Sequence, residues 1–201
     1  DALPILFFKV LIGCILYAHW YQHINEHIYR MLCFTLKPSL IRQKMTEGDL
    51  SLAFLIEPTL LDTKKFDQHV IQLDEYVAYM DKNHLLSDKG LLEWSDISDY
   101  EIATFNKSFT TYDLVTEKFA SQGISPKFAY LSSTWDFLVE STYQTDLIAI
   151  LPKPISHLVD SSRFKAVTFK DPIPFNIWFC RPYKSSYSEV ESYVYEEVLR
   201  D

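Results

Sequence analysis

The chain contains 201 residues, of which 48% are hydrophobic, 15% aromatic and 23% charged, and its net charge is −8 at pH 7. This length and composition are typical of a globular protein that forms one large domain or two smaller lobes. The negative charge and the absence of any run of basic residues exclude broad contact between this chain and a nucleic-acid phosphate backbone. The three cysteines, Cys14, Cys33 and Cys180, are widely spaced and form no Cys-x-x-Cys motif, as is typical of reduced thiols in a cytosolic protein.

The most apolar segment of the chain lies near its start, from Ile5 to Ala18. Its 14 residues, interrupted by Lys9, are fewer than the roughly 20 that a membrane-spanning helix needs. The lysine and the lack of a small-x-small cleavage site also argue against a signal peptide. We therefore predict that this segment is a buried helix. Because the sequence starts without Met, we expect it to be a fragment or an excised domain.

Three histidines, His19, His23 and His27, follow one another at intervals of four residues, with Glu26 beside the last. In a helix they would share one face at the spacing of zinc ligands. However, the β-branched Ile24 and Ile28 alternate, together with Glu26, with Asn25, His27 and Tyr29, and this period of two predicts a strand. A strand would separate the imidazoles, so we favour partly exposed surface histidines. A zinc-binding protein is the alternative if the segment is helical.

Predicted helices and strands alternate over the rest of the chain. The stretch 50–56 is nearly all apolar, a pattern typical of buried strands in parallel sheets. The alternation predicts an α/β fold with a doubly wound sheet. In chain order we expect a helix over 35–48, strands over 50–56 and 75–80, a loop over 81–90, a strand over 101–105, a helix over 108–123, a strand over 127–131, a helix over 132–144, strands over 147–151, 164–169 and 175–180, and a final helix over 185–200.

Capping residues mark the ends of these predicted helices. Gly48 and Gly123 stand where a glycine commonly ends a helix. Hydroxyl residues stand at the starts, some of them three residues before an acidic residue, which is the spacing of a capping box. The predicted N-caps are Thr35, one of Ser108, Thr110 and Thr111, Ser133 in a box with Asp136, and Ser186 or Ser188 in overlapping boxes with Glu189 and Glu191.

Four phrases of the sequence, taken in order, resemble a known family. They are "MTEGDLSLAFL", "LDEYVAYMDKNHLLSDK", "LIAILP" and "KDPIPFNIWFCRP". Each phrase alone is a weak signal, but their order and spacing together are specific. From about Leu6 to the last residue, the chain resembles the effector-binding (substrate-binding) domain of LysR-type transcriptional regulators.

The resemblance implies the fold of type 2 periplasmic binding proteins, in which two doubly wound α/β lobes are joined by two crossover strands. Lobe I would comprise residues 1–73 plus 173–201 and lobe II residues 74–172, with hinges at "LDEY" and "KDPIP". The N-terminal winged helix-turn-helix domain of these regulators is absent from this chain. DNA would therefore be bound only through that missing domain.

The sequence departs from the family pattern at two places. The family's first strand, which should precede "LPILFF", is absent or cut short, and part of the usual effector site depends on it. The Gly-x-Gly that usually precedes the "LIAILP" strand is replaced by "STYQTD", so we expect a different turn at residues 141–146.

The carboxyl ends of strands and the N-termini of helices should converge between the lobes, where free N–H groups favour a polar or anionic ligand. The residues at those ends are the candidate effector-binding residues, through hydroxyl or amide hydrogen bonds and apolar contacts. For each Ser or Thr, a plain N-cap role is the competing interpretation. The candidates are Thr35, Ile56, Pro58, Phe105, Asn106, Ser108, Ser133, Thr134 and Phe175.

We expect no enzyme, no metal and no cofactor. Asp136 and Glu140 lie four residues apart on one predicted helix, but a solvated helix face explains them. The cysteines share no motif with a histidine.

The resemblance implies a cytoplasmic sensor without a membrane partner. A small-molecule effector would stabilise one arrangement of the lobes and so change how homodimers or tetramers pack, with the helix near 8–19 at the interface. A solute-binding protein of a transporter shares this fold and is the main alternative. A zinc-binding protein using His19, His23 and His27 is the other.

Overall fold

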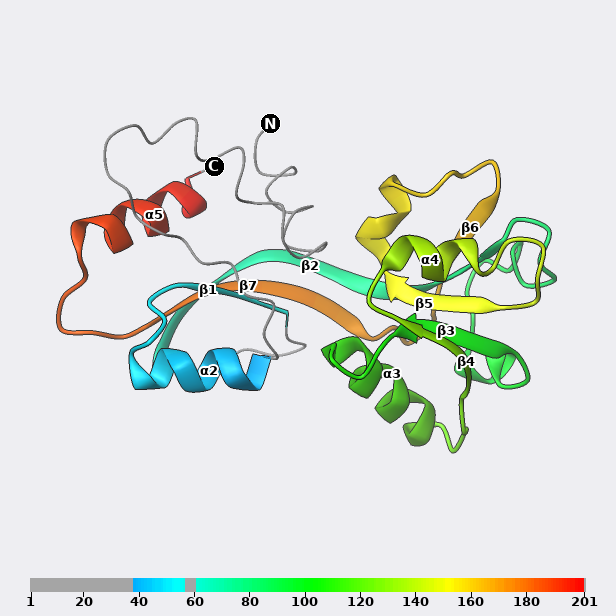
Figure 1. Ribbon diagram of the computed structural model, residues 1–201, viewed down its shortest axis with the longest axis horizontal. Helices are drawn as coiled ribbons and strands as arrows, with labels where there is room; N and C mark the ends of the chain where they lie inside the picture. The colour runs from blue at the N-terminus through cyan, green and yellow to red at the C-terminus, as the bar shows by residue number, and fades with distance from the viewer. Residues whose placement is uncertain (1–37, 57–60, 201) are drawn as a thin grey trace.

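Two long strands, β2 (Phe66–Asp81) and β7 (Pro174–Pro182), run side by side and connect two groups of helices and strands (Figure 1). The computed structural model describes residues 38–56 and 61–200. Its seven strands form one sheet. Six of them follow the order β1-β7-β2-β5-β3-β4, and β6 pairs with β2 on the edge opposite β5. The two ends of this sheet carry different helices, and each group has buried clusters of its own. One further cluster lies mainly in the second group and also contacts Ile56 of the first.

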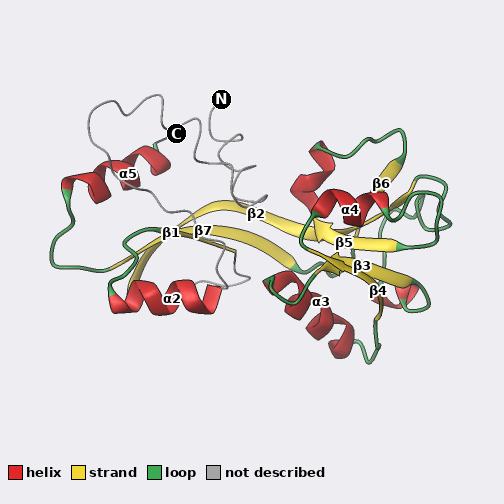
Figure 2. Cartoon of the chain, viewed as in Figure 1, coloured by secondary structure: helices red, strands yellow, loops and turns green. Residues whose placement is uncertain are grey.

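The first group contains β1 (Ala53–Ile56) and the adjoining ends of β7 and β2, all antiparallel to their neighbours. Helix α2 (Pro38–Glu47) and helix α5 (Glu189–Leu199) lie on opposite faces of these strands (Figure 2). On the α2 face, Met45 packs with Leu55 and Cys180, and on the α5 face Phe179 packs with Tyr195. Both faces of this part of the sheet are therefore covered.

The second group is built on the other end of β2, which lies antiparallel between β5 and β6. Strand β3 is parallel to both β5 and β4. Alternate residues of β2 serve two cores: Tyr76 packs with Val115 of α3, and Val77 with Leu138 of α4. The elements of this group are η2 (Trp94–Ile97), β3 (Glu101–Phe105), α3 (Thr110–Ser121), β4 (Lys127–Ser132), α4 (Trp135–Glu140), β5 (Ile148–Pro152), η3 (Lys153–His157) and β6 (Phe164–Thr168).

Strand β5 shows why the sequence of this group predicts a doubly wound sheet. All five of its residues are buried, because α3 covers one face and α4 with η3 covers the other. A strand buried on both faces needs a continuous apolar run, as in "IAIL". The predicted strand–helix alternation is confirmed here.

The strand predicted at 50–56 differs from expectation. In the structure it begins at Ala53 and lies antiparallel to β7, with Leu55 paired to Trp178. Only Leu55 is fully buried among its residues. The apolar run reflects the helices that cover its two faces, and a parallel neighbour is not needed to explain it.

Strand β2 is much longer than the predicted 75–80 segment. Its first half, "FDQHVIQLD", contains polar residues at both alternating positions and gives no strand signal. Pairing with β7 supplies the backbone hydrogen bonds there, and the ladder carries a bulge between Val70 and Gln72.

Two predicted helix caps are wrong. Helix α3 begins after Phe109, which stands at the N-cap with extended backbone and no capping side chain. Asn106 is the reason: its Oδ1 accepts the backbone N–H of Ser108 in a local turn and delays the helix. Helix α4 begins after Thr134, so the predicted box of Ser133 with Asp136 does not form.

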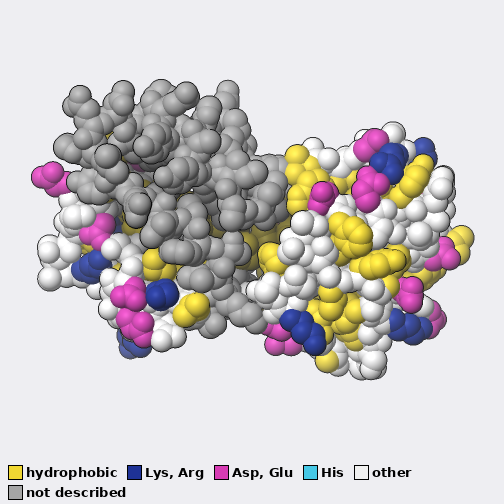
Figure 3. Space-filling model, in the orientation of Figure 1, with side chains coloured by type: hydrophobic (Ala, Val, Ile, Leu, Met, Phe, Trp, Pro, Cys, Tyr) yellow, Lys and Arg dark blue, Asp and Glu magenta, His cyan; other side chains and the backbone are white. Residues whose placement is uncertain are grey.

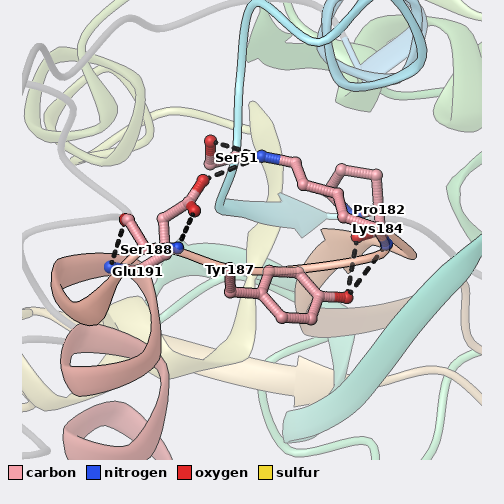
Figure 4. Close-up of polar contacts among 6 residues, drawn as sticks. All are labelled: Ser51, Pro182, Lys184, Tyr187, Ser188 and Glu191. Atoms are coloured by element: carbon pink, nitrogen blue, oxygen red, sulfur yellow. Dashed lines mark hydrogen bonds and ion pairs between the residues drawn. The ribbon is translucent and has the colours of Figure 1, made fainter.

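The last helix starts as predicted by the second of its two boxes. Ser188 accepts the backbone N–H of Glu191, and the Glu191 side chain accepts that of Ser188. The same carboxylate binds Lys184 Nζ at 2.8 Å, and Lys184 also donates to Ser51 at 3.0 Å (Figure 4). These contacts hold the start of α5 against the segment before β1 and lower the pKa of Glu191 to about 2.

The turn at 141–146 contains no glycine, yet one of its residues has the backbone conformation that favours glycine. Gln144 adopts φ 55°, in the left-handed region that a glycine would occupy without strain. Its backbone N–H donates to Asp81 Oδ2 at 2.8 Å, while Oδ1 of the same carboxylate accepts the N–H of Asn83 at 2.8 Å. Asp81 therefore joins two turns, and these hydrogen bonds hold its pKa below the usual range.

Gly48 and Gly123, with φ of 86° and 69°, follow α2 and α3 as predicted. The predicted first helix, the histidine trio, Thr35 and Pro58 lie outside the described residues. Within the described ranges, no helix is both long and apolar enough to cross a bilayer.

Candidate functional site

The carboxyl ends of β3, β4 and β5 lie at the edge of the sheet that faces the first group (Figure 1). The backbone N–H of Asn106, just after β3, donates to the carbonyl of Ser132 at the end of β4 at 2.9 Å. Thr104 donates its hydroxyl to the carbonyl of Ile150 in β5 at 2.9 Å. These bonds bring the segments that follow the three strands to one edge.

Polar side chains follow these strand ends. Ser132 Oγ accepts the backbone N–H of Thr134 at 3.1 Å, which leaves the hydroxyl of Ser133 exposed and outside any cap. Ser108 is exposed and Asn106 half-buried. Because Phe109 cannot cap α3, the first N–H groups of this helix keep their capacity to donate to a ligand.

Aromatic residues form the apolar part of this edge. Phe105 stacks on Phe109 with ring centroids 4.7 Å apart, and both pack toward Trp135 and the α4 face. Phe175, on the returning crossover, lies on the opposite face. Its ring meets that of Tyr76 edge-on at 5.4 Å.

Tyr76 connects the crossover to α3. Its hydroxyl lies 3.1 Å from that of Thr111 in the first turn of the helix, and both side chains are buried. Burial raises the pKa of Tyr76 to about 12, so its hydroxyl stays protonated at neutral pH. The first group reaches the same region through Ile56, which pairs with Ile177 of β7 and packs against the core that contains Phe175.

The charged residues at this edge are paired. Lys153, the first residue after β5, binds Glu75 of β2 through Nζ and Oε1 at 2.9 Å. That contact raises the pKa of Lys153. Asp74 accepts the backbone N–H of Glu75 and the side-chain amide of Gln72.

The structure thus brings Phe105, Asn106, Ser108, Ser133 and Thr134 to one sheet edge, and Phe175 and Ile56 to the crossover beside it. We call these seven residues, with Tyr76 and Thr111, the strand-end site. Tyr76 and Thr111 were missed by sequence reasoning. Their contact joins positions 35 residues apart, and a lone Tyr in a strand carries no signal for it.

The described part of the chain contains no candidate metal centre. Residues 38–56 and 61–200 contain no group of three His, Cys, Asp or Glu side chains that could hold an ion. Of the paired carboxylates considered above, Glu140 binds Arg163 through two contacts of 2.8 Å, while Asp136 is exposed. A bidentate ion pair of this kind is a structural contact.

Comparison with curated proteins and solved structures places these features in a family. Residues 33–194 match the LysR substrate binding domain. The chain is 21% identical over 133 residues to the uncharacterized HTH-type transcriptional regulator YwbI of Bacillus subtilis, a match that covers 66% of this chain. The chain spans only 44% of that regulator's length.

Two solved structures show the shared fold at low sequence identity. The regulatory domain of CcmR from Synechocystis PCC6803, in complex with 2-PG, has a TM-score of 0.67 at 12% identity, covering 81% of this chain and 78% of that one. The effector binding domain of BenM, with its effector benzoate, has a TM-score of 0.65 at 15% identity, covering 100% of this chain and 85% of that one. The expected type 2 periplasmic-binding-protein-like fold is confirmed. Since the family match extends over most of the sequence, the chain belongs to the LysR substrate binding domain family.

Proposed function

We propose that this domain senses a small polar or anionic effector at the strand-end site and transmits its binding to transcriptional regulation. One observation supports the proposal most directly. This chain is a LysR substrate binding domain, and in it three strand ends and the uncapped start of α3 converge beside the two crossover strands. N–H groups at a helix start favour anionic or polar groups.

The roles of the site residues follow from their chemistry. Asn106, Ser108, Ser133 and Thr134 would hydrogen-bond the effector, while Phe105, Phe175 and Ile56 would contact its apolar part. Thr35 and Pro58 belong to the same proposal, although they lie outside the described residues. The CcmR domain is in complex with 2-PG and the BenM domain with its effector benzoate, which supports a small-molecule effector here.

We further propose that the two groups of elements are lobe I, residues 1–73 plus 173–201, and lobe II, residues 74–172. The pairing of β2 supports this division. Glu75 is its last residue paired with β7, and Tyr76 is its first residue paired with β5. The effector would stabilise one arrangement of the lobes by binding it more tightly than the other.

Self-association is the route by which lobe movement would reach DNA. Strand β4 lies at one end of the sheet path, and hydrophobic side chains gather over β4 and α4 on the second group (Figure 3). Tyr130, Leu131 and Phe137 are 44%, 40% and 49% exposed, and the rings of Tyr130 and Phe137 meet at 5.6 Å. This apolar surface supports self-association as a homodimer or tetramer. The full regulator would be cytoplasmic, and its winged helix-turn-helix domain would contact DNA.

The family match favours this sensor over a transporter's solute-binding protein, because the matched domain is that of a transcriptional regulator. A regulatory domain is not an enzyme class, and we propose no catalytic activity.

The test is native mass spectrometry of the chain with small-metabolite mixtures, with metal content read from the same sample. We expect a metal-free protein that captures a small organic mass, with affinity about 5- to 10-fold weaker in Ser133→Ala, the loss of one hydrogen bond. Ser125→Ala is the matched control, since Ser125 is exposed before β4 at the other edge. Stoichiometric zinc whose removal unfolds the protein would instead support the histidine trio.

A further inference from the structure

The backbone ladder of β2 changes partner at one point, between Glu75 and Tyr76. Glu75 is paired with Pro174 of β7, and Tyr76 with Pro152 of β5. Proline has no backbone N–H, so neither partner can donate to the ladder at this junction. Backbone pairing is therefore weakest where the crossover enters the sheet of the second group.

Side-chain contacts hold the strand in place at this junction. On one face of the strand, Glu75 binds Lys153 at 2.9 Å, directly after Pro152. On the other face, Tyr76 contacts Thr111. The backbone N–H of Tyr76 donates to the carbonyl of Ile173 on the returning crossover at 2.9 Å, so both crossovers are joined at the same level.

The Glu75–Lys153 pair is held in place but reached by solvent. The backbone N–H of Glu75 donates to Asp74, which fixes the strand beside the pair. The side chains of Lys153 and Glu75 are 47% and 24% exposed, so added salt screens their attraction. The Asp67–Arg181 pair of the same strand joins β2 to β7 inside the first group and does not span the junction.

We propose that the Glu75–Lys153 ion pair is an electrostatic clamp that fixes the pivot between the two groups at Tyr76. With the pair closed, as in the structure, the sheet of the second group includes β2 from Tyr76 onward. With the pair open, this end of the ladder loosens, and the two groups reorient more freely. Ionic strength therefore tunes lobe movement in the absence of any effector. Solvent-exposed ion pairs of this type change a population about 1.5- to 5-fold.

Hydrogen exchange of the whole 201-residue chain tests the clamp, with Glu75→Gln and Lys153→Met as variants. Exchange is compared at about 0.01 M and about 1 M salt, where the Debye length is about 30 Å and about 3 Å. We expect peptides covering 72–79 and 150–156 to exchange about 1.5- to 5-fold faster in either variant at low salt. High salt should produce the same change in the unaltered chain and none in the variants.

Two controls separate the clamp from general destabilisation. Lys170→Met removes a similar pair, Lys170 with Glu93 at 3.1 Å, within the second group away from the junction. The exchanged pair Glu75→Lys with Lys153→Glu should restore slow exchange and salt sensitivity. Equal effects in Lys170→Met, or no recovery in the exchanged pair, would overturn the proposal.

Lobe movement itself is measured by fluorescence transfer between dyes at Gln43 of α2 and Glu117 of α3, attached through unnatural azide-bearing residues. Both positions are exposed and lie in different groups. A broader distribution of distances in Lys153→Met than in Lys170→Met is expected. Faster local exchange with an unchanged distribution would show a frayed strand end and refute the pivot. Neither readout requires an effector, so the clamp can fail while the proposed sensing function stands.

Discussion

The hydroxyl groups of Tyr76 and Thr111 lie 3.1 Å apart and join the crossover strand β2 to the first turn of α3. Both residues are buried, and Tyr76 also packs edge-on against Phe175 of the other crossover. One aromatic side chain thus connects both crossovers to the helix whose N-terminus faces the strand-end site. If the two groups are the proposed lobes, a change in the angle between them would alter the contacts of this residue.

Replacing Tyr76 with Phe should lower the free energy of unfolding by about 1–2 kcal/mol, because the buried Thr111 hydroxyl loses its side-chain partner. Thr111→Val should have a similar cost for the converse reason. The double variant should cost clearly less than the sum, since no buried hydroxyl is then left unpaired. Urea unfolding of the four proteins gives the coupling energy. Additive losses would mean that the two hydroxyls do not interact.

Replacing Gln144 with Gly should stabilise the protein by about 0.5–1 kcal/mol. The left-handed backbone at φ 55° is strained for glutamine and not for glycine, and the N–H that binds Asp81 is retained. Ser141→Gly is the control, because Ser141 has an ordinary helical φ of −63° and glycine there should destabilise the protein. The measurement is thermal or urea unfolding, and a loss of stability in Gln144→Gly would contradict the strain.

Glu191 should make stability depend on acid pH. Its folded pKa is lowered from 4.5 to about 2 by hydrogen bonds, of which the one from Lys184 has the largest effect, followed by those with Ser51 and the backbone of Ser188. A lowered folded pKa stabilises above the unfolded value, so the contribution is complete above pH 4.5 and is lost as the pH falls toward 2. After allowance for solvent screening we expect a loss on the order of 2 kcal/mol.

Urea unfolding at several acid pH values measures this loss. Glu191→Gln should flatten the profile between pH 4.5 and about 2. Glu196→Gln, at an exposed position of the same helix, should keep the slope of the unaltered chain. Equal slopes in all three proteins would exclude Glu191 as the source.

Tyr130→Ser with Phe137→Ser should weaken self-association while leaving the fold intact, because both rings are about half exposed in the described structure. Sedimentation velocity over a range of concentrations measures the effect. We expect at least a 10-fold increase in the dissociation constant, about 1.4 kcal/mol, for loss of two apolar contacts. Tyr193→Ser on α5, 54% exposed, is the matched control. If both variants associate like the unaltered chain, the apolar surface over β4 and α4 is not the interface.

Local sequence signals located most elements of the second group. Strand β3 has the predicted bounds 101–105, since "EIATF" is a short apolar run with polar residues on either side. Helix α5 begins at the predicted Ser188 box, because a capping box involves only residues three positions apart. Helix α4 ends at Glu140, earlier than predicted, and the residues that follow form turns in which Gln144 binds Asp81.

For the strand-end site, the sequence located the strand ends but not their partners. Asn106, Ser133 and Thr134 follow strands that could be recognised from their apolar residues alone. Their neighbours Tyr76, Thr111 and Lys153 could not be chosen, since each acts through a residue at least 35 positions away. The positions of Thr35 and Pro58 relative to this site stay predictions.

The sequence by itself determined the α/β class, the family and most strand and helix positions, because periodicity, caps and turn residues act over a few neighbouring positions. Only the tertiary structure decided the length of β2, the antiparallel pairing of β1, the uncapped start of α3 and the ion pair at the crossover junction. These features depend on which distant strand supplies a backbone partner and which distant side chain meets a charge or hydroxyl. Such contacts are made only when the chain has folded, and a pattern among neighbouring residues cannot predict them.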